Sequence, residues 1–306
     1  MDKLTVTGYF RRPAFLVAQH KGFFAKERLD VGFHLVGLCP DHNRELAEGV
    51  WPITMSSADT MLARATQDGV DFVVFMEAEQ GLDVQLVAKP EIKSFADLRG
   101  KIFAADPVDS NFDLVRNKIM LDNGVAESEY GIKILGNSHH RLAGFLEGKV
   151  SAAMLAPPST EKAVAAGGHI MAEGEEYVKD WPIVCGWGLR SWAEANRPLL
   201  VRYIRAYAAA TDWLLRPENR EETLALVMAE EKLSRHRAEL TYKYVVPHCA
   251  IDPEAIRKNI ELRIDLGYYK PPHKPAEAFY DMSYWSEATG LPIPKPAGRP
   301  KNAVPA

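Results

Sequence analysis

Three polar residues stand where an expected buried strand runs into an expected helix: Ser56, Ser57 and Asp59, within residues 53–60. Serine is a favoured N-cap, and Ser56 followed three residues later by Asp59 resembles a capping box. A helix that starts here presents free backbone N–H groups and the positive end of its dipole. A carboxylate, sulfonate or phosphate can bind at such a start without a basic side chain. The alternative is that these side chains only cap the helix.

Thiol and imidazole groups offer a second kind of chemistry. Cys39, His42 and Arg44 follow an expected strand, and together they could form an activated thiolate beside a group that holds an anion. A buried and unreactive Cys39 is the interpretation that we prefer. Cys185 and Cys249 are expected to be buried structural thiols, because three scattered cysteines cannot form a disulfide framework.

His139-His140-Arg141 is the one cluster with obvious titratable chemistry. Adjacent residues on a helix do not face the same way, which argues against a two-histidine metal site. One of the two could contact a ligand, and the alternative is a solvated loop or helix start. The chain contains no H-E-x-x-H, P-loop or G-x-G-x-x-G motif. We therefore expect no metal and no cofactor.

The composition is that of an ordinary globular protein: 306 residues, 47% hydrophobic and 25% charged, with a net charge of −4. Basic residues are spread among acids, so we expect no nucleic-acid partner. No apolar run approaches the roughly 18 residues of a membrane span, so we expect no membrane insertion. Because no signal peptide precedes the first strand pattern, the sequence as it stands predicts a cytoplasmic protein, or a periplasmic one if a signal was removed before Met1.

Strand and helix patterns alternate in the first part of the chain. Strands are expected at residues 4–10, 29–37, 51–55 and 72–75, with helices between them, which is typical of a parallel sheet covered by helices. The same pattern returns at an offset of about 98 to 102 residues, where residues 101–106 match 3–8, Glu147-Gly148 matches Glu48-Gly49, and Met154 matches Met55. The repeat predicts two similar α/β lobes.

In open α/β sheets, ligands bind beyond the carboxyl ends of the strands. The corner at residues 53–60 and its counterpart at 154–159 are therefore expected to form opposite walls of one cleft. After residue 190 the pattern is nearly all helical, and these helices are expected to pack on the first lobe. The predicted domains are lobe one at residues 1–87 and 186–291, lobe two at 88–185, and an extended or disordered tail at 292–306.

Several segments resemble the periplasmic solute-binding proteins of the sulfonate, nitrate, taurine and thiamine-pyrimidine-precursor type. Residues 18–31 (AQHKGFFAKERLDV) are similar to that family's Gly-Phe-Phe and Glu-x-Leu-Asp-Val segment, and residues 93–101 (KSFADLRGK) to its entry into lobe two. Residues 190–198 and 206–213 are similar to its late helices. The resemblance covers residues 4 to about 288. It implies a two-lobed type II periplasmic-binding-protein-like fold, each lobe a mixed, mostly parallel sheet with helices on both faces.

The resemblance also implies where a ligand would be contacted. By position, the family's contact sites fall after the first strand, at the first corner, at the first helix of lobe two, and at two later corners. The residues at these places are Tyr9, Phe10, Ser56, Ser57, Asp59, Asp109, Ser110, Asn111, His139, Pro157 and Trp187.

Two functions remain open on this evidence. The first is binding of a small organic anion or heterocycle in the interlobe cleft, as the solute-binding component of an ABC-type uptake system with a permease partner, or as a cytosolic relative. The second is a cytosolic enzyme on the same fold, a desulfinase, decarboxylase or C–X hydrolase acting on a small aromatic or heterocyclic acid. Its candidate catalytic residues are Cys39, His42, His139 and His140.

Overall fold

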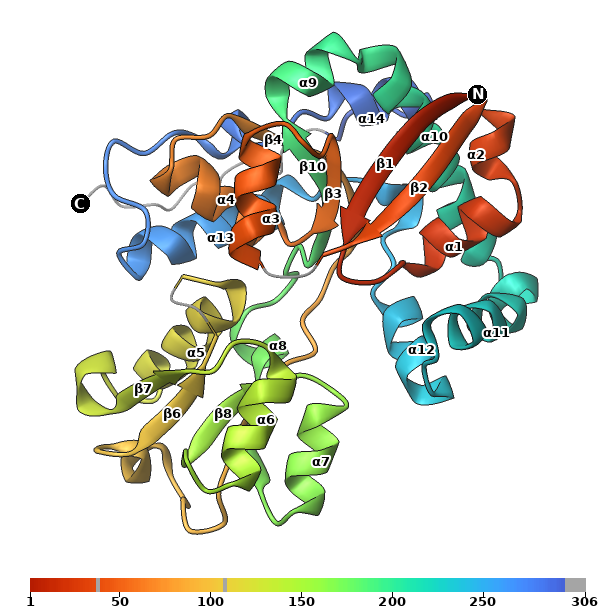
Figure 1. Cartoon of the computed structure of the whole chain (residues 1–306). Coiled ribbons are helices and arrows are strands. Elements are labelled where there is room, and N and C mark those ends of the chain that lie inside the picture. Colours follow the sequence, from red (N-terminus) through yellow and green to blue (C-terminus); the bar gives the residue numbers. More distant parts are fainter. Residues whose placement is uncertain (37–38, 107–108, 295–306) are drawn as a thin grey trace.

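Two lobes, one above the other in Figure 1, make up the protein in a computed structural model that describes residues 1–36, 39–106 and 109–294. The side chains of Cys39 and Pro40 also lie outside the described part. Each lobe is built on one five-stranded sheet with its own buried core. The α/β, two-lobed fold class predicted from the sequence is confirmed.

The first sheet has the strand order β2-β1-β3-β10-β4. Strand β1 is parallel to β2 and β3, whereas β10 is antiparallel to both β3 and β4. The chain enters β10 last, after it has passed through the other lobe. The bounds are β1 Asp2–Gly8, β2 Leu29–Leu35, β3 Ile53–Ser56, β4 Phe72–Glu79 and β10 Val184–Leu189.

The second sheet repeats this plan with the order β7-β6-β8-β5-β9. Here β6 is parallel to β7 and β8, and β5 is antiparallel to β8 and β9. Strand by strand, the two sheets are equivalent, which explains the sequence repeat at an offset of about 100 residues. The bounds are β5 Gln85–Ala88, β6 Ile102–Ala105, β7 Gly131–Ile134, β8 Ala152–Leu155 and β9 His169–Glu173.

Helices between the strands cover both sheets, and local signals set where they begin. Pro13 opens α1, Ser57 caps α4, Ser110 caps α5 and Asn137 caps α6. The bounds in lobe one are α1 Pro13–His20, α2 Phe23–Lys26, α3 Cys39–Ala47 and α4 Ala58–Gln67. Those in lobe two are α5 Asn111–Asp122, α6 Ser138–Leu146, α7 Ser159–Ala165 and α8 Gly174–Tyr177, with 3₁₀ turns at Phe95–Leu98 and Glu127–Glu129.

The C-terminal segment is helical, as predicted, and packs largely on lobe one. Helix α10 buries Tyr203 against Phe24 of α2, with ring centroids 5.8 Å apart. The helical segment that follows residue 190 is broken at Asn196, because Pro198 lies in the first turn of α10. The bounds are α9 Arg190–Ala195, α10 Arg197–Leu214, α11 Arg220–Glu231, α12 Arg235–Lys243, α13 Pro253–Asp265 and α14 Ser283–Thr289, with 3₁₀ turns at Pro217–Asn219, Pro247–Cys249 and Ala276–Ala278.

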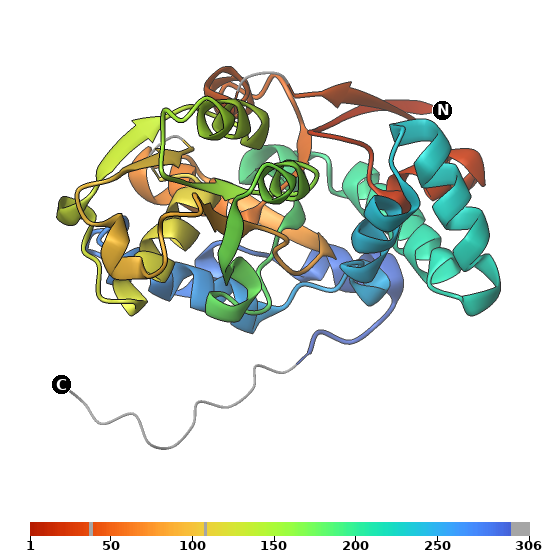
Figure 2. The same ribbon diagram turned by 90° about the horizontal axis from the view of Figure 1, so that it is seen from below.

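Helix α13 differs from its neighbours because it contacts both lobes (Figures 1 and 2). It packs on α4 of lobe one, and its Leu262 belongs to the buried apolar cluster of lobe two. The sequence pattern predicted helices in this part of the chain but not this position. As a result, the C-terminal segment forms a third connection between the lobes.

The chain passes between the two sheets at residues 80–84 and 178–183. Gly81 N donates to Trp181 O over 2.7 Å, so the two connections run together. The boundaries expected at 87/88 and 185/186 fall inside β5 and β10, and we propose lobe boundaries at these two connections instead. Of the expected tail, residues 292–294 have neither helix nor strand, and residues 295–306 lie outside the described part.

Candidate functional site

Arg263 joins the two lobes near the ends of their strands. Its guanidinium donates to both carboxylate oxygens of Asp59, over 2.7 and 2.8 Å, and to Oδ1 of Asp109 over 2.5 Å. Asp59 belongs to α4 of lobe one, whereas Asp109 stands just before α5 of lobe two. The strand-end corners of the two lobes therefore meet within the reach of one side chain.

These three side chains are almost completely shielded from water: Arg263 and Asp59 are 0% exposed and Asp109 is 8% exposed. Burial alone would lower the pKa of Arg263, but the neighbouring carboxylates of Asp59 and Asp109 raise it, so the guanidinium stays charged. Arg64 adds a second contact to Asp109, with Nη2 3.2 Å from Oδ2. The bridge is thus a buried network of paired charges.

The start of α4 is capped differently from the expected capping box. Ser57 Oγ accepts from Asp59 N over 3.2 Å, while the Asp59 carboxylate turns away to Arg263. Ala58 N donates to Pro182 O of the second connection over 3.1 Å. Two backbone N–H groups of this helix start are therefore occupied, and a negative charge already stands beside them. An anionic ligand would be repelled here unless Asp59 stayed paired.

Ser56 and Trp187 lie in the core of lobe one and bond to each other. Nε1 of Trp187 donates to Oγ of Ser56 over 3.1 Å, and the Trp187 ring packs edge-on against Phe72. Trp187 is 0% exposed, so its indole fills the core beneath the corner. In this arrangement the two residues pack beneath the corner at the start of α4 and hold it in position.

The corner after β1 carries a charge that the sequence analysis missed. Arg12 stacks on Phe10, with its guanidinium carbon 3.7 Å from the ring centroid, and pairs with Glu79 at the end of β4 over 2.9 Å. Tyr9 is 46% exposed and Phe10 is half-buried. Burial raises the pKa of Glu79, and its Oε1 has no hydrogen-bond partner among the described residues. In the sequence, the only sign of this buried ion pair was an acidic residue, Glu79, at the end of an apolar strand.

The lobe-two corners are formed by helix starts. Ser110 caps α5 by accepting from Asp113 N over 3.2 Å, and Asp109 itself has a left-handed backbone with φ of 71°. Asn137 caps α6 by accepting from the backbone N of both His139 and His140, over 3.1 and 3.2 Å. Both histidine side chains are exposed. The half-buried residues Asn111 and Pro157 complete the predicted set, at the start of α5 and after β8.

Arg141 organises this edge of lobe two, a role that the sequence analysis did not assign to it. It is 0% exposed, and its Nε donates to Met154 O of β8 over 2.7 Å. The same guanidinium reaches Ser138 Oγ at the start of α6 over 3.1 Å and Asp106, after β6, over 3.3 Å. One buried cation therefore holds three strand and helix ends together. In the sequence, a lone arginine on an apolar helix face was the sign that this side chain is buried and paired.

The catalytic candidates lie in two helices, with Cys39 and His42 in α3 of lobe one and His139 and His140 in α6 of lobe two. His42 is buried, with Nε2 3.2 Å from Thr7 Oγ1 and 3.3 Å from Thr54 Oγ1, and burial lowers its pKa to about 4. Its imidazole is therefore neutral near pH 7. The Cys39 side chain lies outside the described part. Cys185 and Cys249 are buried thiols whose pKa is raised by burial, to about 12 for Cys249, as expected for structural cysteines.

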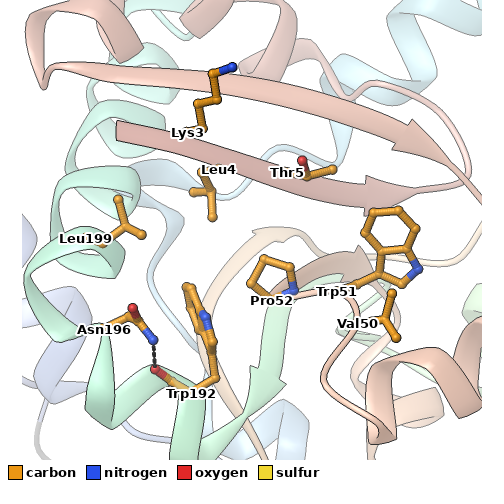
Figure 3. A pocket seen from close by; sticks show the side chains of 9 residues that line it. All are labelled: Lys3, Leu4, Thr5, Val50, Trp51, Pro52, Trp192, Asn196 and Leu199. Carbon is orange, nitrogen blue, oxygen red and sulfur yellow. Dashed lines mark hydrogen bonds between the residues drawn. The ribbon is translucent and has the colours of Figure 1, made fainter. Parts of the chain in front are cut away.

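A cavity of about 320 Å³ lies far from these corners, beside the amino-terminal ends of β1 and β3 (Figure 3). Leu4, Trp51, Pro52 and Trp192 supply much of its apolar wall. It contains none of the predicted ligand residues. Within the described ranges, no three or more His, Cys, Asp or Glu side chains are arranged to hold a metal ion. No helix in the described part combines the length and apolar character needed to cross a bilayer.

Comparison with known proteins identifies a family that matches this chain and solved structures that share its fold. The family model described as NMT1/THI5 like matches residues 12–219 of the chain. No curated protein sequence matches the chain.

Several solved structures have the same fold at low sequence identity. The alkanesulfonate-binding protein SsuA from Xanthomonas axonopodis pv. citri, bound to MOPS, has a TM-score of 0.73 at 15% identity, covering 91% of this chain and 98% of that one. The periplasmic nitrate-binding protein NrtA from Synechocystis PCC 6803 has a TM-score of 0.72 at 15% identity, covering 95% and 89%. The desulfurization enzyme DszB has a TM-score of 0.67 at 11% identity, covering 94% and 99%.

Proposed function

Because the chain belongs to the NMT1/THI5-like family, we propose that it binds a small organic anion or heterocycle between its two lobes. The observation that carries the proposal is the Arg263 bridge, which brings the corner before α4 and the corner before α5 together. Two lobes that meet at their strand ends can close over a small molecule and expel water from it.

The polar end of the ligand is proposed to bind at the start of α6. This helix has no acidic residue in its first turn, whereas α4 and α5 carry Asp59 and Asp113 there. An anion at the α6 start would meet the positive end of the helix dipole and the exposed side chains of His139 and His140. The flat part of the ligand is proposed to lie against the aromatic corner at Tyr9 and Phe10.

Calorimetry over a panel of sulfonates, carboxylates and pyrimidines tests this proposal. We expect saturable heat with at least one class, and a roughly tenfold loss of affinity for an anionic ligand when His139 and His140 are both changed to alanine. The control is His236→Ala, an exposed histidine on α12, which should leave affinity unchanged. A folded sample that gives no heat with any member of the panel would count against binding.

Catalysis on the same scaffold is the second candidate, and DszB shows that an enzyme can have this fold. Against it, His42 is held between Thr7 and Thr54 as a neutral imidazole. Cys39, His139 and His140 remain as candidate groups. A Cys39 that reacts rapidly with iodoacetamide and is protected by ligand would favour the enzyme, whereas an inert Cys39 would remove its proposed nucleophile.

An ABC permease that receives the ligand belongs to the first proposal. The similarity to NrtA, which is named as periplasmic, supports a periplasmic setting for this role. Co-purification with a permease expressed from a neighbouring gene would support it. Neighbouring catabolic genes would favour the enzyme instead.

A further inference from the structure

The end of helix α12 lies on the first of the two connections between the lobes, residues 80–84. Gly81 of this connection has φ of 132°, a backbone conformation that residues with a side chain rarely adopt. A Cβ atom at Gly81 would overlap Cδ1 and Cε1 of the ring of Tyr244, the residue that ends α12. The Tyr244 ring therefore rests directly on the backbone of the connection, and only glycine leaves room for it.

Backbone hydrogen bonds hold this ring in place. The segment that follows α12 pairs antiparallel with the end of β4. At the start of the connection, Gln80 N donates to Tyr244 O over 2.8 Å. One residue further along, Gly81 N donates to Trp181 O of the second connection over 2.7 Å. The end of α12 and the two connections are thus bonded in a row, with the first connection in the middle.

Two basic side chains of α12 extend this contact toward lobe two. Nη1 of Arg237 lies 3.3 Å from Oδ2 of Asp83 in the first connection, with the two side chains only 23% and 20% exposed. Nζ of Lys243 lies 3.5 Å from Oε2 of Glu175 in α8, at the surface. Elsewhere the helix is anchored in lobe one, where Ala238 belongs to a buried apolar cluster with α1 and α11. Helix α12 therefore reaches from lobe one across the first connection to lobe two.

Any opening of the lobes has to be absorbed by the connections. Hinge motions change the torsion angles of a few loop residues and leave packed cores intact. Gly81 is the one glycine of the first connection, so its torsion angles can change at the lowest steric cost. The Tyr244 ring on one side and the Trp181 carbonyl on the other oppose such a change while they stay in place.

We propose that α12 is a clamp on this hinge, with the Tyr244 ring as its point of contact and the ion pairs of Arg237 and Lys243 as its attachments toward lobe two. The clamp stabilises the arrangement of the lobes that the structure shows, and opening displaces Tyr244 and separates both ion pairs. This property of the fold goes beyond the proposed binding function and does not depend on it, so it can be tested on the chain without ligand.

Hydrogen exchange of the full chain, followed by mass spectrometry, measures the clamp. Peptides that cover residues 80–84 report on opening of the first connection. We expect Tyr244→Ala to accelerate exchange in these peptides by about tenfold or more, because loss of the ring frees the connection. Peptides from β1 and β6 should exchange as in the wild type, because neither core is changed.

Tyr280→Ala is the matched control. Tyr280 is also half-buried, and its segment also pairs with β4 through an isolated bridge, but at Val74, away from the connection. This change should leave exchange at residues 80–84 as in the wild type. Unchanged exchange of these residues in Tyr244→Ala, or equal acceleration in both variants, would overturn the proposal.

A second variant keeps the test decisive if Tyr244→Ala does not fold. The double change Arg237→Met and Lys243→Met removes both ion pairs and leaves the ring in place. We expect it to accelerate exchange at residues 80–84 as well, and wild-type exchange there would show that α12 does not clamp the hinge.

Discussion

The residue that most shapes this protein is Arg263, because it is the only partner that could neutralise Asp59 inside the described part of the fold. A buried ion pair adds little when compared with apolar packing, but removing one partner leaves an uncompensated buried charge. Asp59 and Asp109 are therefore dependent on a side chain that lies 204 and 154 residues further along the chain.

We predict that Arg263→Met destabilises the protein by about 3 to 5 kcal/mol, because it leaves the buried carboxylate of Asp59 without a cationic partner and leaves Asp109 with Arg64 alone. Urea unfolding followed by circular dichroism measures the free energy of unfolding. Arg257→Met is the control on the same helix, since Arg257 is exposed and pairs with Glu254 and Glu261 at the surface, and it should cost less than about 1 kcal/mol. Equal effects of the two changes would contradict the prediction.

Glu77 is a further buried acid, and it has no cationic partner in the described structure. It is 0% exposed, and its Oε2 accepts from Asp252 N over 2.8 Å. Burial raises its pKa from 4.5 to about 8, against the smaller opposing effect of that hydrogen bond. The folded protein therefore holds a proton on Glu77 at neutral pH.

This proton makes stability depend on pH. Between about pH 4.5 and 8 the folded state keeps a proton that the unfolded chain releases, so Glu77 lowers the free energy of unfolding as pH rises, by up to about 1.4 kcal/mol per pH unit. The effect is absent below about 4.5 and levels off above about 8. We predict that Glu77→Gln removes this slope, while Glu48→Gln, an exposed acid after α3, retains it. Urea midpoints at several pH values provide the measurement, and parallel curves for wild type and Glu77→Gln would refute it.

At the scale of elements, three helix starts that look alike in sequence end up in different electrostatic surroundings. Helices α4, α5 and α6 each have a Ser or Asn cap. An acid stands in the first turn of α4 and of α5, whereas the first turn of α6 carries His139 and His140. Because all three starts are capped, the charge of the first turn is the feature that distinguishes how they interact with an anion.

We predict that Asn137→Ala lowers stability by about 1 kcal/mol and also weakens binding of an anionic ligand, because the cap orients the start of α6. Ser234→Ala removes an equivalent cap from α12, where Ser234 Oγ accepts from Arg237 N over 3.3 Å. It should cost similar stability without changing affinity. Unfolding and calorimetry on both variants separate the two effects, and an unchanged affinity for Asn137→Ala would move the ligand away from α6.

At the scale of the whole molecule, three connections hold the lobes in register. Two are the chain segments at residues 80–84 and 178–183, and the third is α13 with Arg263 and Leu262. Asp109 of lobe two pairs with Arg263 of α13 and with Arg64 of α4, and these charged contacts can be weakened without disturbing either lobe core.

Asp109→Asn should weaken the closed arrangement by about 1 to 3 kcal/mol, because it replaces a charge-assisted hydrogen bond with a neutral one. Asparagine also tolerates the left-handed backbone at this position. We expect a larger radius of gyration by small-angle X-ray scattering. Asp71→Asn, at an exposed acid paired with Arg190, is the control and should scatter as the wild type does. Identical scattering from all three proteins would show that Asp109 does not hold the lobes together.

The sequence by itself determined the features that depend on near neighbours along the chain. Apolar periodicity decided which segments are strands and helices, and Ser57 marked a helix start, because a cap acts within three residues. The repeat with its offset of about 100 residues predicted two equivalent sheets, since each lobe repeats the same local pattern.

Only the tertiary structure decided which charges meet. Asp59 and Asp109 looked like ligand contacts, and their pairing with Arg263 depends on how α13 packs across both lobes. Arg12 with Glu79 and Arg141 with Asp106 were missed for the same reason. A local sequence pattern indicates whether a residue faces the core. The partner of a buried charge, however, comes from a distant segment that packs in the same space. The two charges then pair because desolvating either one alone is costly.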